Sequence, residues 1–210
     1  TITADIFKGY KTTYNKNIPL TMGLMSNSEI FADNTEKAKV LELITDYGCS
    51  VAIHGSVSYP TMNQDQLFEY LDTQRTYITN NLVAPTSIIY PYHDYTELSS
   101  TIAGSYYGVC CTGGTNNPIS YGGDSKLAGP RSNMYTLYRF SLFNAQMTTQ
   151  KIKEAIDYAS ENNMIFLPFF HDVDLATDYE RCKDLLDYCV DYANTKGLEF
   201  INIGDIPYIK

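Results

Sequence analysis

The chain has 210 residues, of which 44% are hydrophobic and 19% are charged, and its formal net charge is −9. This length and apolar content predict a single folded domain, residues 1–210, and exclude an intrinsically disordered chain. The acidic balance argues against a nucleic-acid partner, because phosphate backbones are bound by clustered Lys and Arg. No apolar run approaches the roughly 20 residues of a transmembrane helix, and no signal peptide is visible.

Helical patterns recur along the chain and have recognisable ends. The first is expected over residues 5–16, so the chain starts on a helix. The next runs over residues 34–47, where Gly48 stops it, and a third runs over residues 61–81. Two more follow, one after residue 148 and one that ends at Lys196 and Gly197. The side chains expected to cap these helices are Asn34, Thr61 with Gln64, Thr148, and Thr177 with Glu180.

Short apolar runs, partly β-branched, separate the helical patterns, as is typical of parallel strands that are buried on both faces. Strands that alternate with helices form parallel sheets with right-handed crossovers. We therefore predict an α/β fold, a distorted (β/α) barrel of about seven parallel strands with surrounding helices. The expected strands cover residues 20–25, 51–54, 87–90, 106–112, 136–140, 164–170 and 198–203.

All three histidines, His54, His93 and His171, lie at the carboxyl ends of predicted strands or shortly after them. Sites of parallel α/β folds form at the carboxyl ends of the strands, and imidazole suits both metal ligation and proton transfer. A single histidine at a strand end is more often structural, but three of three favour a site. The aromatic turn formed by Tyr90, Pro91 and Tyr92 has the same two interpretations, since it either packs as a turn or offers rings to a sugar.

The order of these elements resembles that of the polysaccharide deacetylases, the NodB-homology domain of carbohydrate esterase family 4. The resemblance covers nearly the whole chain. It is carried by YNKNIPLT at 14–21, GCSVAIHG at 48–55, YPY at 90–92, LPFFHD at 167–172, and the closing LLDY at 185–188 with IGDI at 203–206.

The resemblance implies removal of acetyl groups from an N-acetylated glycan by metal-assisted amide hydrolysis, with zinc as the expected divalent ion. His54 would be a metal ligand, and His171 would protonate the leaving amine. The substrate would be bound by Tyr90, Pro91, Tyr92 and Phe169. The backbone N–H of Tyr92 would also stabilise the oxyanion. The implied partner is a bacterial or extracellular glycan, and the implied location is extracellular or at a cell surface.

Two departures from the family pattern bear on catalysis. The strand with the family's paired aspartates would precede Thr1, and Asp5 lies in the helix after it. Ser58 stands where a second metal-binding histidine is expected, and a neutral hydroxyl is a poor zinc ligand. A catalytic zinc needs about three protein ligands, so a chain that holds no metal is the alternative expectation. Candidate replacements are His93, Asp94 and Asp172.

Three hypotheses follow. The first is an active deacetylase. The second is a non-catalytic carbohydrate-binding module derived from the same fold, of the kind used for adhesion at cell surfaces or phage tails. The third is a structural barrel domain within a larger assembly. Acetate release that depends on a metal favours the first, and glycan binding that is insensitive to chelators favours the second.

Overall fold

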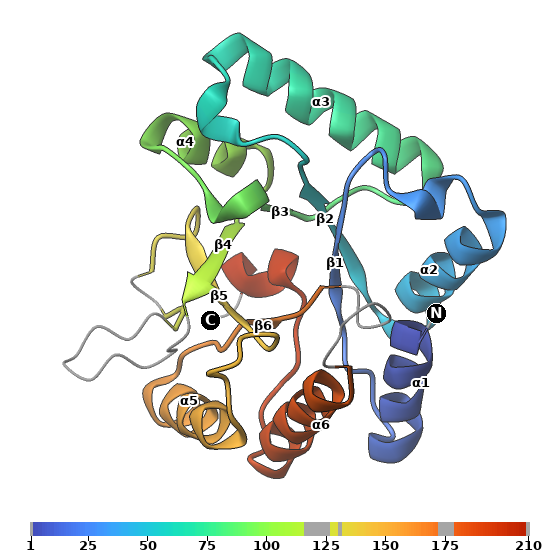
Figure 1. Cartoon of the computed structure of the whole chain (residues 1–210), viewed down its shortest axis with the longest axis vertical. Helices are drawn as coiled ribbons and strands as arrows, with labels where there is room; N and C mark the ends of the chain where they lie inside the picture. The colour runs from blue at the N-terminus through green and yellow to red at the C-terminus, as the bar shows by residue number, and fades with distance from the viewer. Residues whose placement is uncertain (1, 116–126, 130–131, 172–178, 209–210) are drawn as a thin grey trace. The chain divides into compact units, whose positions relative to one another are not determined.

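The computed structural model describes residues 2–115, 127–129, 132–171 and 179–208. The chain divides into two compact units: unit 1 comprises Thr1–Thr112, Met134–Thr136 and Phe200–Lys210, and unit 2 comprises Gly113–Asn133 and Leu137–Glu199. The elements (Figure 1) are α1 (Ile2–Tyr14), β1 (Thr21–Leu24), α2 (Asn34–Tyr47), β2 (Ser50–His54), α3 (Gln64–Asn81), β3 (Ser87–Ile89), α4 (Glu97–Tyr107), β4 (Cys110–Thr115), β5 (Leu137–Ser141), α5 (Thr149–Asn162), β6 (Pro168–Phe169) and α6 (Tyr179–Thr195).

The strands follow one another in the sheet in chain order, β1-β2-β3-β4-β5-β6. The pairs β1–β2, β2–β3, β3–β4 and β5–β6 are parallel, and helices occupy most of the connections, as right-handed crossovers require. The α/β fold class is confirmed, with six strands in the described residues. The expected seventh strand, residues 198–203, is wrong. Residues 198–202 are irregular, and a 3-10 helix, Ile203–Tyr208, follows.

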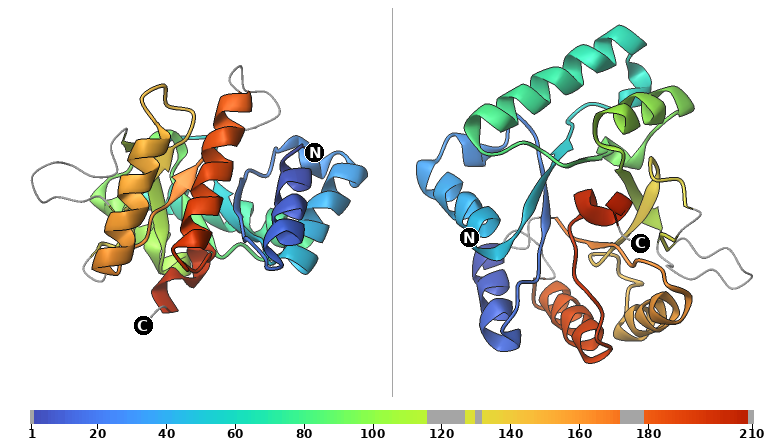
Figure 2. Two further views of the ribbon diagram at one scale, coloured as in Figure 1. Left: turned by 90° about the horizontal axis from the view of Figure 1, so that it is seen from below. Right: turned by 180° about the vertical axis from the view of Figure 1, so that it is seen from behind.

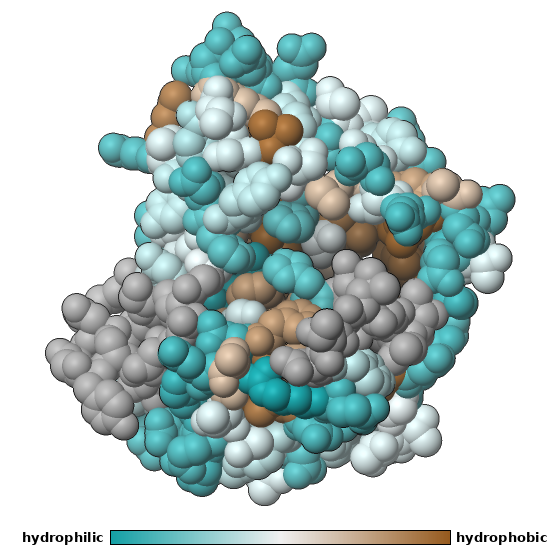
Figure 3. Space-filling model, viewed as in Figure 1, coloured by the Kyte–Doolittle hydropathy of each residue, from teal (hydrophilic) through white to brown (hydrophobic). Residues whose placement is uncertain are grey.

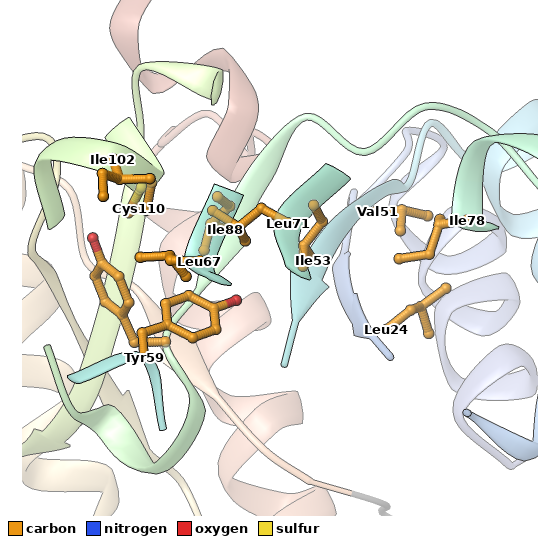
Figure 4. Close-up of a cluster of buried hydrophobic side chains, with 12 residues drawn as sticks. Leu24, Val51, Ile53, Tyr59, Leu67, Leu71, Ile78, Ile88, Ile102 and Cys110 are labelled. Carbon is orange, nitrogen blue, oxygen red and sulfur yellow. The ribbon is translucent and has the colours of Figure 1, made fainter. Parts of the chain in front are cut away.

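The core of unit 1 lies between its strands and α3. Val51, Ala52 and Ile53 of β2 are fully buried, as the continuous apolar run predicts. Leu67, Leu71 and Ile78 repeat along α3 at spacings of four and seven, which places them on one face of the helix. Figure 4 shows Val51, Ile53 and the three α3 side chains in one cluster with residues from β1, β3, α4, β4 and the 3-10 helix before α3: Leu24, Tyr59, Ile88, Ile102 and Cys110.

Unit 2 consists of a two-stranded part of the sheet, β5 and β6, with α5 and α6, which lie side by side in both views of Figure 2. Charged contacts join the two helices. The carboxylate of Asp157 on α5 accepts from Lys153 and Lys196 Nζ at 2.6 Å each and from the Tyr192 hydroxyl at 2.8 Å. Both helices are strongly amphipathic, and their apolar faces are buried.

Two of the predicted helix caps are displaced by one or two residues. Asp33, not Asn34, caps α2, and its carboxylate accepts from two backbone N–H groups at the helix start. The capping box of α3 is formed by Asn63 and Gln66 rather than by Thr61 and Gln64. Thr148 caps α5 as predicted, whereas the expected cap at Thr177 lies outside the described residues.

Candidate functional site

His54 is the last residue of β2, and its side chain is held by the neighbouring strand. Its Nδ1 lies 3.1 Å from the carbonyl oxygen of Ile89, its register partner on β3. A carbonyl can only accept, so Nδ1 carries the proton, and in the neutral ring Nε2 is the nitrogen with a lone pair. Metal-binding histidines are often oriented by this kind of bond. The parallel register of β2 and β3 brings His54 to the edge where the aromatic turn begins.

The turn after β3 is the 3-10 helix Pro91–His93, and it carries one exposed ring. Tyr92 and His93 have φ angles of 55° and 63°, a left-handed conformation that residues other than glycine rarely adopt. Backbone bonds from His93 to Tyr90 and from Asp94 to Pro91 close the turn. The Thr112 hydroxyl on β4 donates to the His93 carbonyl at 2.8 Å. Strain of this kind persists where the surroundings hold the backbone.

The aromatic residues of this turn have different positions. Tyr90 is fully buried and donates its hydroxyl to the Tyr135 carbonyl at 2.8 Å, and Pro91 is also buried. Both therefore hold the turn in place. Tyr92 is 72% exposed, the most exposed large hydrophobic side chain in the described part of the chain. In Figure 3 the visible described surface is mostly hydrophilic, with apolar colour in small patches.

Hydrogen bonds join the aromatic turn to the loop after β2. The Tyr92 hydroxyl donates to the Ser56 carbonyl at 3.1 Å, and Ser58 Oγ donates to Asp94 Oδ2 at 2.9 Å. Buried aromatic rings support the loop from below: Tyr59 lies edge-on to Tyr90 at 5.9 Å between ring centroids. We call the set His54, Ser56, Ser58, Tyr92 and Asp94 the strand-end surface of unit 1.

The zinc ion implied by the family resemblance does not fit the described residues. Within residues 2–115, 127–129, 132–171 and 179–208, no three His, Cys, Asp or Glu side chains are close enough to hold a metal together. Ser58, at the position of the second expected ligand, uses its hydroxyl as a donor to Asp94. Of the proposed replacements, His93 and Asp94 are described and form no such group, and Asp172 lies outside the described residues.

The other predicted site residues belong to unit 2. His171 follows β6 and is exposed, and its ring stacks on Phe143 at 6.3 Å and meets Phe169 edge-on at 5.5 Å. Phe169 is only 8% exposed, and the Arg139 guanidinium lies 4.4 Å above its ring. The structure thus brings His54 to the aromatic turn within unit 1, and His171 to Phe169 within unit 2. Convergence of the two sets on one cleft stays a prediction.

Sequence reasoning did not place Ser56 in the strand-end surface and considered Ser58 and Asp94 only as metal positions. No motif marks Ser56, because it contributes backbone groups. The Ser58–Asp94 bond had a weak signal in the sequence, since each residue comes four residues after the end of an expected strand, residues 51–54 and 87–90. Two short polar residues at such positions are also common in ordinary turns.

Comparison with known proteins identifies the fold. A scan of family models and a search of curated proteins both gave no match. Among solved structures, the chain is similar to the Xyl-CE4 domain of a multidomain xylanase from the hindgut metagenome of Trinervitermes trinervoides. The TM-score is 0.56 at 9% identity, covering 100% of this chain and 87% of that one.

A second similar structure is described as a T48 deacetylase with substrate. Its TM-score is 0.53 at 10% identity, with 95% of this chain and 81% of that chain covered. The chain therefore has the fold of the polysaccharide deacetylases of carbohydrate esterase family 4, as the sequence motifs predict.

Among the helices that the structure describes, none has the length and hydrophobicity of a transmembrane span.

Proposed function

We propose that the chain binds a glycan at the strand-end surface of unit 1 and that this binding needs no metal ion. The observation that carries the proposal is the Tyr92 ring, which is 72% exposed on a backbone held in a left-handed conformation. A tyrosine ring is flat, rigid and amphipathic, so it contacts the apolar face of a sugar at little entropic cost. Its position is fixed before a ligand arrives, which favours affinity.

Polar groups beside Tyr92 suit the hydroxyls of a sugar. Asp94 is exposed and accepts from Ser58, and an ionised carboxylate has further lone pairs for sugar hydroxyl donors. The half-buried imidazole ring of His54 adds a nitrogen atom to the polar groups that suit sugar hydroxyls. The fold supports the same assignment, since a similar structure is a deacetylase with its substrate. The proposed partner is a bacterial or extracellular glycan, and we place the protein outside the cell or at its surface.

The experiment is calorimetric titration of the protein with chito- and xylo-oligosaccharides. The Tyr92→Ala variant is expected to bind about 30-fold more weakly, as truncation of an anchoring aromatic typically costs about 2 kcal/mol. The matched control is Leu98→Ala, which also truncates an exposed apolar side chain, 49% exposed on α4, outside the strand-end surface. Equal affinities for the wild type and Tyr92→Ala, or no binding to any oligosaccharide, would overturn the proposal.

A second candidate function is hydrolytic removal of acetyl groups from an N-acetylated glycan. It is favoured by the fold shared with the deacetylase and by the exposed position of His171 after β6. In this proposal His171 protonates the leaving amine, a role that imidazole can fill near neutral pH. Acetate release from chito-oligosaccharides that is lost in His171→Ala would support it. Binding without acetate release, with or without added zinc, would leave glycan recognition as the function.

A further inference from the structure

The first turns of α3 and the segment before them border a hollow of about 420 Å³ in unit 1. The hollow is shallow and open to solvent, and its volume is within the roughly 300–1,000 Å³ of small-molecule sites, so a bound sugar would keep part of its surface in water. Its lining combines apolar and polar groups, as a sugar ring combines C–H faces and hydroxyls. The lining residues are Thr61, Met62, Gln66, Glu69, Tyr70 and Thr73.

Two chains of hydrogen bonds connect the hollow to the strand-end surface. Ser56 accepts from the Tyr92 hydroxyl through its carbonyl and donates its N–H to the Tyr70 hydroxyl at 3.0 Å. Ser58 donates to Asp94 through Oγ, while its carbonyl accepts from Thr61 Oγ1 at 2.6 Å. Each serine is therefore shared by a residue of the strand-end surface and a residue that lines the hollow.

These contacts limit the distance between the two places. The Tyr92 and Tyr70 hydroxyls are separated by two hydrogen bonds and one residue, whose span is about 3.6 Å, so their oxygens lie within about 10 Å of each other. An oligosaccharide of a few sugars spans such a distance. A glycan stacked on Tyr92 can therefore reach the hollow with a neighbouring sugar.

The polar groups of the hollow are suited to hydroxyl donors. Glu69 and Thr73 lie one turn apart on α3, and both are exposed. A carboxylate accepts from sugar hydroxyls, and a threonine hydroxyl both donates and accepts. The Tyr70 ring, half-buried and packed edge-on against Tyr59 at 6.0 Å, provides a fixed apolar side.

We infer that this hollow is a second sugar subsite, occupied by a pyranose of the same glycan chain that stacks on Tyr92. The inference rests on the proposed function and adds a property to it: affinity must rise with chain length. A monosaccharide fills the Tyr92 position alone, and a longer chain also contacts Glu69 and Tyr70. The second sugar is already linked to the first, so its contacts add to the binding free energy without a second loss of translational freedom. Each occupied subsite therefore raises the affinity strongly.

The test is calorimetric titration of the folded protein with chito-oligosaccharides of one to six sugars. A second titration uses xylo-oligosaccharides of the same lengths. Thr73→Trp places a bulky ring in the hollow. Thr79→Trp, also exposed on α3 but outside the lining residues, is the matched control. We expect affinity to rise at least about tenfold along the series, and Thr73→Trp to remove that rise while leaving monosaccharide binding unchanged. Glu69→Gln should reduce the rise in part.

Failure of the inference and failure of the proposed function give different results. If affinity does not change with chain length, or if Thr73→Trp and Thr79→Trp bind long chains equally well, the second subsite is wrong. In that case loss of binding in Tyr92→Ala still supports the strand-end surface. If no oligosaccharide binds, both proposals are wrong. Circular dichroism of each variant checks that the helices remain folded.

Discussion

Both units of the chain have buried apolar side chains, and they differ in the surface features that those side chains support. In unit 1, the strands β2 and β3 are buried along most of their length, and rings such as Tyr59 and Tyr90 pack beneath an exposed turn. In unit 2, β6 has only two residues, and charged contacts around Asp157 join α5 to α6. A dense apolar base can hold a strained, exposed aromatic in place, and this is why we locate the binding surface in unit 1.

The largest expected effect comes from crowding the base of the binding surface. A Cβ atom at Gly55 would approach the Tyr59 ring to 2.8 Å, the Tyr70 hydroxyl to 2.9 Å and Pro91 to 3.1 Å. Real Cβ atoms do not come this close, so Gly55→Ala should lower the free energy of unfolding by about 2–3 kcal/mol and weaken glycan binding. Urea denaturation and calorimetry provide the two measurements.

The control for this substitution is Gly9→Ala on α1, where a Cβ would meet nothing within 4 Å. Alanine is the better helix former, so the control should gain roughly 0.5–1 kcal/mol. If the two glycine variants have the same stability, the close packing at Gly55 is not what supports the turn.

The fold was largely predictable from the sequence because buried parallel strands leave continuous apolar runs. Residues 51–54 and 87–90 show this plainly, and the structure has β2 and β3 there within one residue at each end. Residues 198–203 look similar but do not pair. There the Ile203 N–H donates to Thr21 Oγ1, and Asn202 Nδ2 donates to the Gly48 carbonyl. Side-chain bonds of this kind have no periodicity in the sequence.

The candidate site was predictable only in part. Histidines at strand ends and the Tyr-Pro-Tyr turn marked the correct edge of the sheet in unit 1, because carboxyl ends of parallel strands meet there. Which ring of the turn is exposed depends on backbone conformation, and nothing in the residue types distinguishes Tyr90 from Tyr92. The hollow beside α3 was missed for the same reason, since its lining residues have no shared motif.

A smaller effect is expected for the hydroxyl of Tyr90. Tyr90→Phe removes a buried hydrogen bond to the Tyr135 carbonyl, and we expect a loss of about 1 kcal/mol in the free energy of unfolding. The Tyr107 hydroxyl is buried and has no hydrogen-bond partner in the described residues, so Tyr107→Phe should change stability by less than about 0.5 kcal/mol. Denaturant titration of both variants compares them, and a larger loss in Tyr107→Phe would contradict this account.

The smallest effect is expected in unit 2 and depends on pH. Hydrogen bonds from Lys153, Lys196 and Tyr192 hold the pKa of Asp157 well below its ordinary value. A carboxyl with a lowered pKa contributes stability above its unfolded pKa, near 3.9, and loses it as the pH falls through the folded value. The stability difference between the wild type and Asp157→Asn should therefore shrink below about pH 4. The contribution is small, because these charges are solvent-exposed.

Hydrogen exchange shows which of the two units loses stability in the Asp157→Asn variant. Amides of α5 and α6 should lose protection in Asp157→Asn near neutral pH, while those of β2 and β3 should not change. Equal loss in both units would mean that the ion contacts stabilise the whole chain rather than unit 2.

The central claim is that the strand-end surface of unit 1 binds a glycan without a metal. The most direct measurement is one calorimetric titration with chito-oligosaccharide in EDTA and a second with added zinc, with free acetate assayed in both samples. We predict the same dissociation constant in the two titrations and no acetate. Binding that appears only with zinc would contradict the claim. Acetate released only with zinc would also contradict it and would indicate a metal-dependent deacetylase instead.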